Sequence, residues 1–298
     1  MHRTIGGLIR LTRIREYLFF VTVTTLLGVS AAGGKFGWPL VAVLLGNMLA
    51  VGFAFMINDV EDAPDDALNP RKLKRNPVSA RDVTPRAAWI ASLVVAALAF
   101  LVYLPLGAVP LALGTLCLGL GFVYSWRRLR LKNIAFLDFL SHVMMLAGLQ
   151  YLCAYFTFTG SFNDKWLVPF IFVVAISLYG ELFNEMRDLE GDLKAGLRHT
   201  AAVLGGRFTY WAMMTIFAIG VGAGVITFFW VGVVESWTLV VMACAAVIFI
   251  IPPLLKLRRS HNSIETQEPL QKPLEMAGAL GLLAQFMVPW VARIFGGG

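Results

Sequence analysis

The chain has 298 residues, of which 58% are hydrophobic and only 14% are charged. A typical soluble domain is about 45–50% apolar and about 25% charged, so this composition excludes an ordinary soluble enzyme and a disordered scaffold. The net charge of +7, taken alone, is compatible with nucleic-acid binding. The three cysteines fall inside apolar runs without metal-ligand spacing and are interpreted as small hydrophobic residues.

Nine stretches of the chain are long enough to cross a bilayer, because a transmembrane helix needs roughly 20 apolar residues. No long segment is left over for a second, soluble domain. The sequence therefore predicts an all-α integral membrane protein in which residues 1–298 form a single transmembrane domain. The spans are predicted at 17–34, 37–57, 87–104, 106–124, 134–157, 166–183, 208–230, 236–255 and 274–295.

Loop charge indicates the orientation of these spans, because cytoplasmic loops carry an excess of lysine and arginine. With the amino terminus in the cytoplasm, 22 of the 25 basic residues fall on the cytoplasmic side, and only Lys35, Lys165 and Arg293 fall on the other. We expect a multi-pass protein of a prokaryotic cell membrane, with no nucleic acid as partner. One alternative is that the apolar run from Tyr17 to the small residues 30–32 is a signal peptide, but the charge alternation counts it as a span.

The first of two acidic clusters stands at the end of the second predicted span, with five acidic residues between positions 58 and 66. Asn58, Asp62 and Asp66 repeat every four residues, which places them on one face of a helix. Pro64 removes an amide donor and clashes with the preceding turn. We therefore expect a kink after Asp62, with Asp65 and Asp66 on a new short turn from which only one of them reaches a metal.

The second acidic cluster stands at the end of the sixth predicted span and has the same spacing. Asn184, Asp188 and Asp192 repeat every four residues, and Glu190 lies between the last two. Like charges at this spacing repel, and Mg²⁺ binds carboxylate oxygens while keeping waters and substrate phosphates as further ligands. The two clusters together predict a site for metal-bound diphosphate. The alternative is that both are solvated helix ends that balance nearby arginines.

At these residues the sequence resembles the UbiA superfamily of intramembrane prenyltransferases. The family's first motif, N-D-x-x-D-x-x-x-D, is matched at 58–66, and its second, D-x-x-x-D with an acidic residue between, at 188–192. Residues 75–81 look like the family's R-P-x-x-S-G segment, with Asn-Pro and Ala as departures. Residues 124–132 look like the Y-S-x-P-P-x-x-L-K run of the chlorophyll and tocopherol branches, with two arginines in place of the two prolines.

The resemblance implies nine helices in a horseshoe around a central cavity that opens to lipid on one side. A polyprenyl diphosphate donor would place its tail in the cavity and its head on Mg²⁺ between the acidic clusters. A lipophilic acceptor, expected to be aromatic or to contain a ring, would attack the allylic cation and lose a proton. The residues expected to bind metal are Asn58, Asp59, Asp62, Asp66, Asp188, Glu190 and Asp192. Those expected to act in catalysis are Asp62, Asp188, Lys132 and Lys194, and those expected to bind substrate are Asn58, Arg127, Arg128, Lys132, Lys194, Asn184, Asp138 and His142.

Four polar residues inside the predicted spans are further candidates. Asp138 and His142, four residues apart, either orient the acceptor and receive its proton or hydrogen-bond each other across one helical turn. Asn47 shares the face of the first motif and favours an interhelical hydrogen bond over a place in the cavity wall. Glu181 lies seven residues before Asp188 on the same face, as a further ligand or as a buried acid with an arginine partner.

Other proteins of the membrane also use carboxylates. A transporter of a divalent cation, or of an anion with its counter-ion, is the main alternative, but transporters place their sites near the bilayer midplane, whereas both clusters lie at span ends. A soluble-type isoprenyl chain elongase carries D-D-x-x-D, and a CDP-alcohol phosphotransferase carries D-G-x-x-A-R; both patterns are absent from this sequence. The sequence therefore favours prenyl transfer within the membrane.

Overall fold

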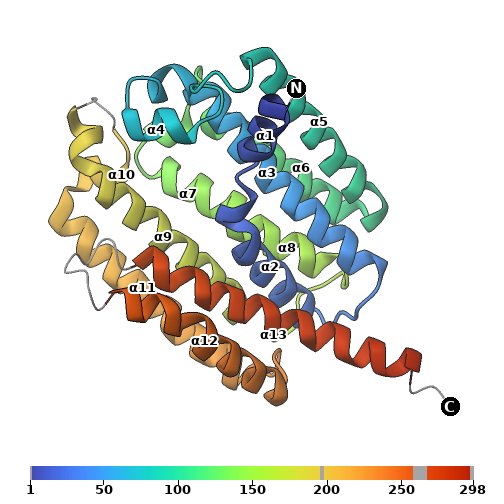
Figure 1. Cartoon of the computed structure of the whole chain (residues 1–298). Coiled ribbons are helices and arrows are strands. Elements are labelled where there is room, and N and C mark those ends of the chain that lie inside the picture. Colours follow the sequence, from blue (N-terminus) through green and yellow to red (C-terminus); the bar gives the residue numbers. More distant parts are fainter. Residues whose placement is uncertain (1, 195–197, 258–266, 296–298) are drawn as a thin grey trace.

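The computed structural model describes residues 2–194, 198–257 and 267–295, which form a bundle of helices without a strand (Figure 1). The α-helices are α1 (His2–Leu11), α2 (Ile14–Ala31), α3 (Trp38–Asp66), α4 (Pro70–Arg75), α5 (Pro85–Tyr103), α6 (Ala108–Ser125), α7 (Leu137–Val143), α8 (Leu149–Phe156), α9 (Leu167–Lys194), α10 (Thr200–Leu204), α11 (Gly206–Phe229), α12 (Ser236–Leu257) and α13 (Gln267–Phe295). Three short segments complete the described chain: the 3₁₀ turns η1 (Leu104–Leu106) and η2 (Leu131–Asn133) and the π-helical segment η3 (Met144–Gly148).

Nine helical stretches in the described residues are long and apolar enough to cross a membrane, which confirms the predicted all-α transmembrane fold. The first begins at Thr4 rather than at residue 17, because only Thr12 and the left-handed Arg13 (φ 48°) separate α1 from α2. The second extends to Asp66, nine residues beyond the predicted end at 57. Both extensions carry charged residues that a hydropathy pattern excludes from a span.

The fifth span is interrupted where the sequence predicts one continuous helix over 134–157. Helix α7 ends at Val143, and η3 continues it with π-type hydrogen bonds before α8 begins. The carbonyl of Met145, inside η3, accepts hydrogen bonds from Gln150 Nε2 and Cys117 Sγ, both at 3.2 Å. These side chains stabilise a carbonyl in the irregular segment, as membrane helices require when their regular backbone bonding is broken.

Asn47 links four of the central helices. Its Nδ2 donates to Thr25 Oγ1 in α2 at 2.8 Å and to the carbonyl of Gln150 in α8 at 3.0 Å, while Tyr103 Oη in α5 donates to its Oδ1 at 2.8 Å. All three side-chain hydrogen bonds cross between helices, as expected from the sequence. Gly46 permits the close approach of Tyr103, since a Cβ there would lie 2.7 Å from the ring.

The carboxyl-terminal ends of α3 and α9 carry the two acidic clusters. Figure 1 shows α4 and α10, the short helices that follow these ends in the chain, at one end of the bundle above α7. Helix α7 packs against α9, and α10 packs against both α9 and α11. The loop from α6 to α7, with its basic run, therefore meets the same end of the molecule as the clusters.

Candidate active site

The first acidic cluster lies on the last turns of α3. The helix continues through Pro64 to Asp66, so the new short turn expected for the last two residues is wrong. Asn76 explains how the end is held, because its Nδ2 donates to the Asp66 carboxylate at 2.9 Å and to the carbonyl of Asp59 at 2.7 Å. One amide thus holds the helix on both sides of the proline.

Asn76 belongs to the segment 75–81, which folds back on α3. Its Oδ1 accepts from the backbone N–H groups of Val78 at 2.9 Å and Ser79 at 3.3 Å, an arrangement typical of asparagine in turns. Ser79 Oγ donates to the carbonyl of Ala63 at 2.8 Å. Since Asn76 is fully buried, this turn is a fixed support for the first cluster.

Lys132 brings a cation to the face predicted to bind metal. Its ammonium donates to Asn58 Oδ1 at 2.8 Å and to Asp62 Oδ2 at 2.5 Å, and Ser125 Oγ donates to the same Asn58 oxygen at 3.2 Å. Burial lowers the pKa of Lys132 below its usual value, and the negative charge of Asp62 opposes that shift. An amide oxygen and a carboxylate oxygen of α3 therefore converge on one cationic position.

Arg130, which the sequence analysis did not single out, also reaches Asp62. One guanidinium nitrogen is 3.1 Å from Asp62 Oδ1 and 2.8 Å from Asp65 Oδ2. The residue has a left-handed backbone (φ 45°) just before η2, a conformation uncommon outside glycine. The basic run at 127–132 was visible in the sequence, but which of its members points at Asp62 depends on this turn.

Arg127 and Arg128 take other partners. Arg127 lies 3.1 Å from Asp65 Oδ1, donates from Nε to the carbonyl of Glu61 at 2.9 Å, and is 45% exposed. Arg128 lies over the ring of Trp126, with 5.7 Å from Cζ to the centroid. Their predicted contact with diphosphate stays a prediction.

Asp59 forms a buried ion pair. Its carboxylate accepts hydrogen bonds from Nη2 and, at 3.2 Å, from Nε of Arg13, the left-handed residue between α1 and α2. The Asp59 side chain is fully buried, and the Arg13 side chain is 7% exposed and lies over the ring of Phe55. The carboxylate thus faces the amino-terminal segment, although the sequence grouped Asp59 with the metal ligands.

The second acidic cluster is more open. Asn184 is exposed on α9, and Asp188, one turn later, has a side chain that is 44% exposed and 3.3 Å from Arg187 Nε. The side chains of Glu190, Asp192 and Lys194 lie outside the described residues, so their predicted roles stay predictions. The structure brings Asn184 and Asp188 to one face of α9 at the same end of the bundle as the first cluster.

Two buried acids hold α10 to α7 and α9 through hydrogen bonds. Asp138 accepts from the backbone N–H and the hydroxyl of Thr200, and Glu185 accepts from the N–H of Ala201 at 2.8 Å and lies 3.3 Å from His199 Nδ1. Ligand atoms of Asp138, Glu185 and His199 lie within 4.8 Å of one another, a spacing that would suit a metal ion. Because the start of α10 already takes up both carboxylates, we interpret this group as a structural link.

His142 lies against Glu181 rather than Asp138. Its Nδ1 is 3.3 Å from Glu181 Oε2, and Tyr124 Oη donates to Glu181 Oε1 at 3.2 Å. The hydrogen bond considered between Asp138 and His142 is therefore wrong, because Thr200 takes the Asp138 carboxylate. The arginine partner considered for Glu181 is wrong too, because a histidine and a tyrosine fill both of its oxygens.

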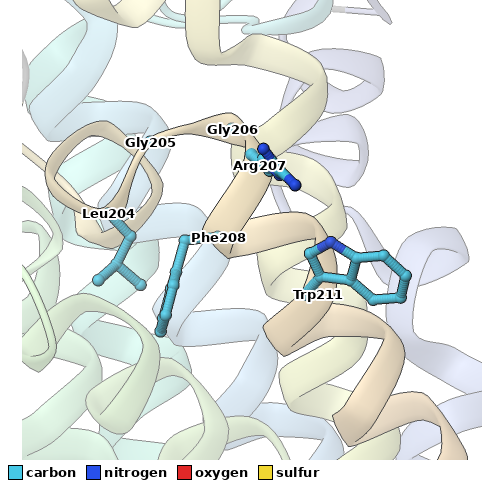
Figure 2. A pocket seen from close by; sticks show the side chains of 6 residues that line it. All are labelled: Leu204, Gly205, Gly206, Arg207, Phe208 and Trp211. Atoms are coloured by element: carbon cyan, nitrogen blue, oxygen red, sulfur yellow. The ribbon is translucent and has the colours of Figure 1, made fainter.

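A surface pocket of about 460 Å³ lies at the start of α11, apart from the acidic residues just described. Figure 2 shows the residues that line it, Leu204, Gly205, Gly206, Arg207, Phe208 and Trp211. Aromatic and basic side chains of this kind are typical of the boundary between lipid and water. The pocket contains none of the predicted metal ligands.

The chain is similar in sequence to known prenyl-transferring proteins. The chain is 28% identical over 185 residues to 2-acylphloroglucinol 4-prenyltransferase of Humulus lupulus, a match that covers 58% of this chain and only 44% of that protein. It is 30% identical over 213 residues to lycopene elongase/hydratase of Haloarcula japonica, covering 70% of each.

A solved structure supports the fold. The structure of a UbiA homolog from Archaeoglobus fulgidus bound to GPP and Mg²⁺ superposes with a TM-score of 0.70, at 19% identity, over 95% of this chain and 99% of that one. A model of the UbiA prenyltransferase family matches residues 20–267, which include both acidic clusters and the basic loop between α6 and α7. The chain therefore belongs to the UbiA prenyltransferase family.

Proposed function

We propose that this protein transfers a polyprenyl group from a polyprenyl diphosphate to a lipophilic acceptor within the membrane, with Mg²⁺ as cofactor. The observation that carries the proposal is the convergence of Asn58 Oδ1 and Asp62 Oδ2 on the Lys132 ammonium, at 2.8 and 2.5 Å. Two oxygen atoms from one helix face thus share a cation, and Arg130 adds a second positive charge beside them.

The residues present fit a magnesium ion. Mg²⁺ prefers oxygen ligands and is usually held by one or two carboxylates together with substrate phosphates, and the Asn58 and Asp62 oxygens already face a common cationic position. The residues that would hold the ion are Asn58 and Asp62, with Asp66, Asp188, Glu190 and Asp192 as predicted. Asp59 is better suited to hold the helix end, because its carboxylate is paired with Arg13. When bound, Mg²⁺ acts as a Lewis acid on the leaving diphosphate oxygens.

The basic side chains supply the second part of the chemistry. Negative charge grows on the diphosphate as its bond to the allylic carbon breaks, and fixed cations in a water-poor site stabilise that charge. Lys132 and Arg130 are the described cations nearest to the proposed metal ligands. Arg127, Arg128 and Lys194 are the outer candidates retained from the sequence.

The acceptor is proposed to be aromatic or to contain a ring. The name of the Humulus relative specifies an acylphloroglucinol, which is aromatic and supports this proposal, whereas that of the Haloarcula relative specifies lycopene, which is lipophilic but acyclic. Asn184, near the acidic end of α9, and His142, in the last turn of α7, are the described residues that we assign to contact with such a molecule. Asp138 supports this region through Thr200 rather than by contact with the acceptor.

The membrane setting follows the same proposal. We place the amino terminus and both acidic clusters in the cytoplasm of a prokaryotic cell, because 22 of 25 basic residues fall on that side of the nine spans. The alternative of an ion transporter is not favoured, since the carboxylates of α3 are engaged by Arg13, Asn76, Lys132 and Arg130 at the end of the helix rather than at mid-membrane.

The test is transfer from labelled geranylgeranyl diphosphate to an added 2-acylphloroglucinol or lycopene by purified protein in lipid nanodiscs, with Mg²⁺ or with EDTA. We expect release of diphosphate and formation of a prenylated product only with the metal. Movement of a divalent cation across a proteoliposome membrane, without consumption of the donor, would support the transporter and contradict prenyl transfer.

A further inference from the structure

Three helices meet at a hydrogen-bonded group that the metal chemistry does not use. Glu181 Oε1 in α9 accepts a hydrogen bond from Tyr124 Oη in α6 at 3.2 Å. Glu181 Oε2 lies 3.3 Å from His142 Nδ1 in α7. The side chains of His142 and Glu181 are 17% and 11% exposed. The pair is therefore nearly enclosed, yet open enough to be touched by a molecule lodged beside it.

The two carboxylate oxygens of Glu181 face different side chains, with Oε1 accepting from Tyr124 Oη and Oε2 lying 3.3 Å from His142 Nδ1. In the neutral tautomer with its hydrogen on Nδ1, toward the acid, an imidazole carries its lone pair on Nε2. This is the tautomer that a proton acceptor at Nε2 requires. Among the described residues the structure gives Nε2 no hydrogen-bond partner. The arrangement places an acid beside Nδ1 and leaves Nε2 on the other side of the ring, as in sites where a histidine acts as a base.

The group of Tyr124, His142 and Glu181 lies further into the membrane span than the proposed metal ligands. Tyr124 directly precedes Ser125, whose hydroxyl donates to Asn58 at 3.2 Å. Glu181 precedes Asp188 by seven residues, about 10 Å along a helix, on the side of the membrane span. The π-helical segment η3 begins two residues after His142, and such segments recur at functional sites.

We propose that His142 is the base that removes the proton lost by the acceptor, with Glu181 as the residue that positions it. This inference rests on the proposed prenyl transfer. A donor with its head at the acidic clusters and its chain in the span brings its reacting carbon to the level between Asn58 and His142.

The proton balance of prenyl transfer requires a base. The allylic C–O bond breaks with its electron pair on the diphosphate, the acceptor A–H forms a bond to the allylic carbon, and the A–H proton must leave. In this assignment His142 Nε2, rather than the released diphosphate, receives that proton and becomes an imidazolium. The Glu181 carboxylate stabilises that new positive charge through Nδ1. The proton passes to solvent when the products leave.

The chain offers a matched control one turn along α9. Glu185 lies 3.3 Å from His199 Nδ1, the same separation as in the first pair. There the acid also accepts from Ala201 N–H and the imidazole Nδ1 faces Ala202 N–H, so this pair caps α10. His199→Asn thus removes a buried histidine next to an acid, without removing the proposed base.

The experiment compares wild type, His142→Ala, Glu181→Gln and His199→Asn in nanodiscs with Mg²⁺ and geranylgeranyl diphosphate. The acceptor is whichever of a 2-acylphloroglucinol and lycopene the wild type prenylates. A general base contributes about 10²–10⁴-fold, so we expect His142→Ala to lower transfer at least about 100-fold while donor binding, measured by titration, stays within about threefold. Glu181→Gln should lower the rate of transfer less than His142→Ala does. Added imidazoles should restore the activity of His142→Ala in the order of their basicity.

The outcomes distinguish a failure of the base assignment from a failure of the proposed prenyl transfer. Transfer by His142→Ala near the wild-type rate, or a loss without any rescue by imidazoles, would show that the pair only braces the helices. His199→Asn should lower the thermal unfolding midpoint without acquiring imidazole dependence; the same rescue in both variants would overturn the assignment. A wild-type protein that prenylates neither acceptor and releases no diphosphate contradicts the proposed function, and the base falls with it.

Discussion

The ends of α3 and α9 carry acidic clusters of the same spacing, but their charges are handled differently. On α3, Asp59 is paired with Arg13, Asp62 with Lys132 and Arg130, and Asp66 with the buried amide of Asn76. On α9, Asp188 has a half-exposed carboxylate whose described contact is its own neighbour Arg187. The three α3 acids are built into the protein, whereas Asp188, the described acid compared with them on α9, is half-exposed.

This difference teaches that similar motifs need not do similar work. Carboxylates already neutralised by fixed cations form a rigid site of low net charge, because each cation is held by its own turn or helix. Asp188 on α9 has a half-exposed carboxylate beside its neighbour Arg187 and is accessible to an incoming cation. We therefore propose that α3 supplies the preformed side of the metal site. The α9 side is completed when the substrate and its metal bind.

The largest effect is expected when a proposed metal ligand is removed from α3 or from α9. Asp62→Ala and Asp188→Ala should each lower prenyl transfer about a thousand-fold or more, because a catalytic metal supplies several kcal/mol and about 1.4 kcal/mol corresponds to a factor of ten. Transfer of labelled geranylgeranyl diphosphate measures the effect, with gel filtration in detergent as the check that both variants stay folded. Wild-type turnover in either variant would remove that helix from the site.

The next effect is on stability and belongs to the α3 side alone. Arg13→Ala leaves Asp59 as a buried unpaired charge, and breaking a buried pair costs about 3–5 kcal/mol. The thermal unfolding midpoint should fall clearly, and Asp59→Asn in the same chain should recover part of the loss. Arg10→Ala is the control, because the Arg10–Asp82 pair is half-exposed on the Arg10 side and exposed pairs contribute up to about 1 kcal/mol. Equal losses in Arg10→Ala and Arg13→Ala would refute the buried pair.

A smaller effect tests whether Asn76 changes the affinity for Mg²⁺ through its contact with Asp66. Asn76→Ala frees the Asp66 carboxylate, and loss of a partner to a ligand typically costs 10–100-fold in metal affinity or activity. The Mg²⁺ concentration for half-maximal transfer should therefore rise by about that factor. Ser79→Ala removes a hydrogen bond from the same turn to the Ala63 carbonyl without touching a carboxylate. A similar rise in both variants would mean that the turn, not the amide, matters.

The smallest effect is expected at the outer edge of the α3 cluster. Asp65→Asn loses contacts to Arg127 and Arg130 at a side chain that is 50% exposed, and exposed pairs contribute little. Transfer should stay within about twofold of wild type. Asp62→Asn is the matched comparison, since it also loses a contact to Arg130 but removes a proposed metal ligand. Equal effects of the two would erase the distinction between inner and outer acids.

Much of the fold and part of the site were predictable from local patterns. Hydropathy located the nine spans because burial in lipid demands long apolar helices, and spacing placed Asn58 and Asp62 on one face because helix geometry is regular. Lys132 was predictable as a cation near the motif. Arg130 was not, since its aim at Asp62 depends on a left-handed turn that many basic runs of this kind lack.

Composition and periodicity thus determine what depends on neighbours in the chain: the membrane class and the two acidic faces. The tertiary structure decided the partners, among them Arg13 with Asp59, Asp138 with Thr200 and His142 with Glu181. These pairs are separated by 39 to 62 positions along the chain. A charge or hydrogen bond acts over a few ångströms, so its partner is known only when packing has brought distant helices together.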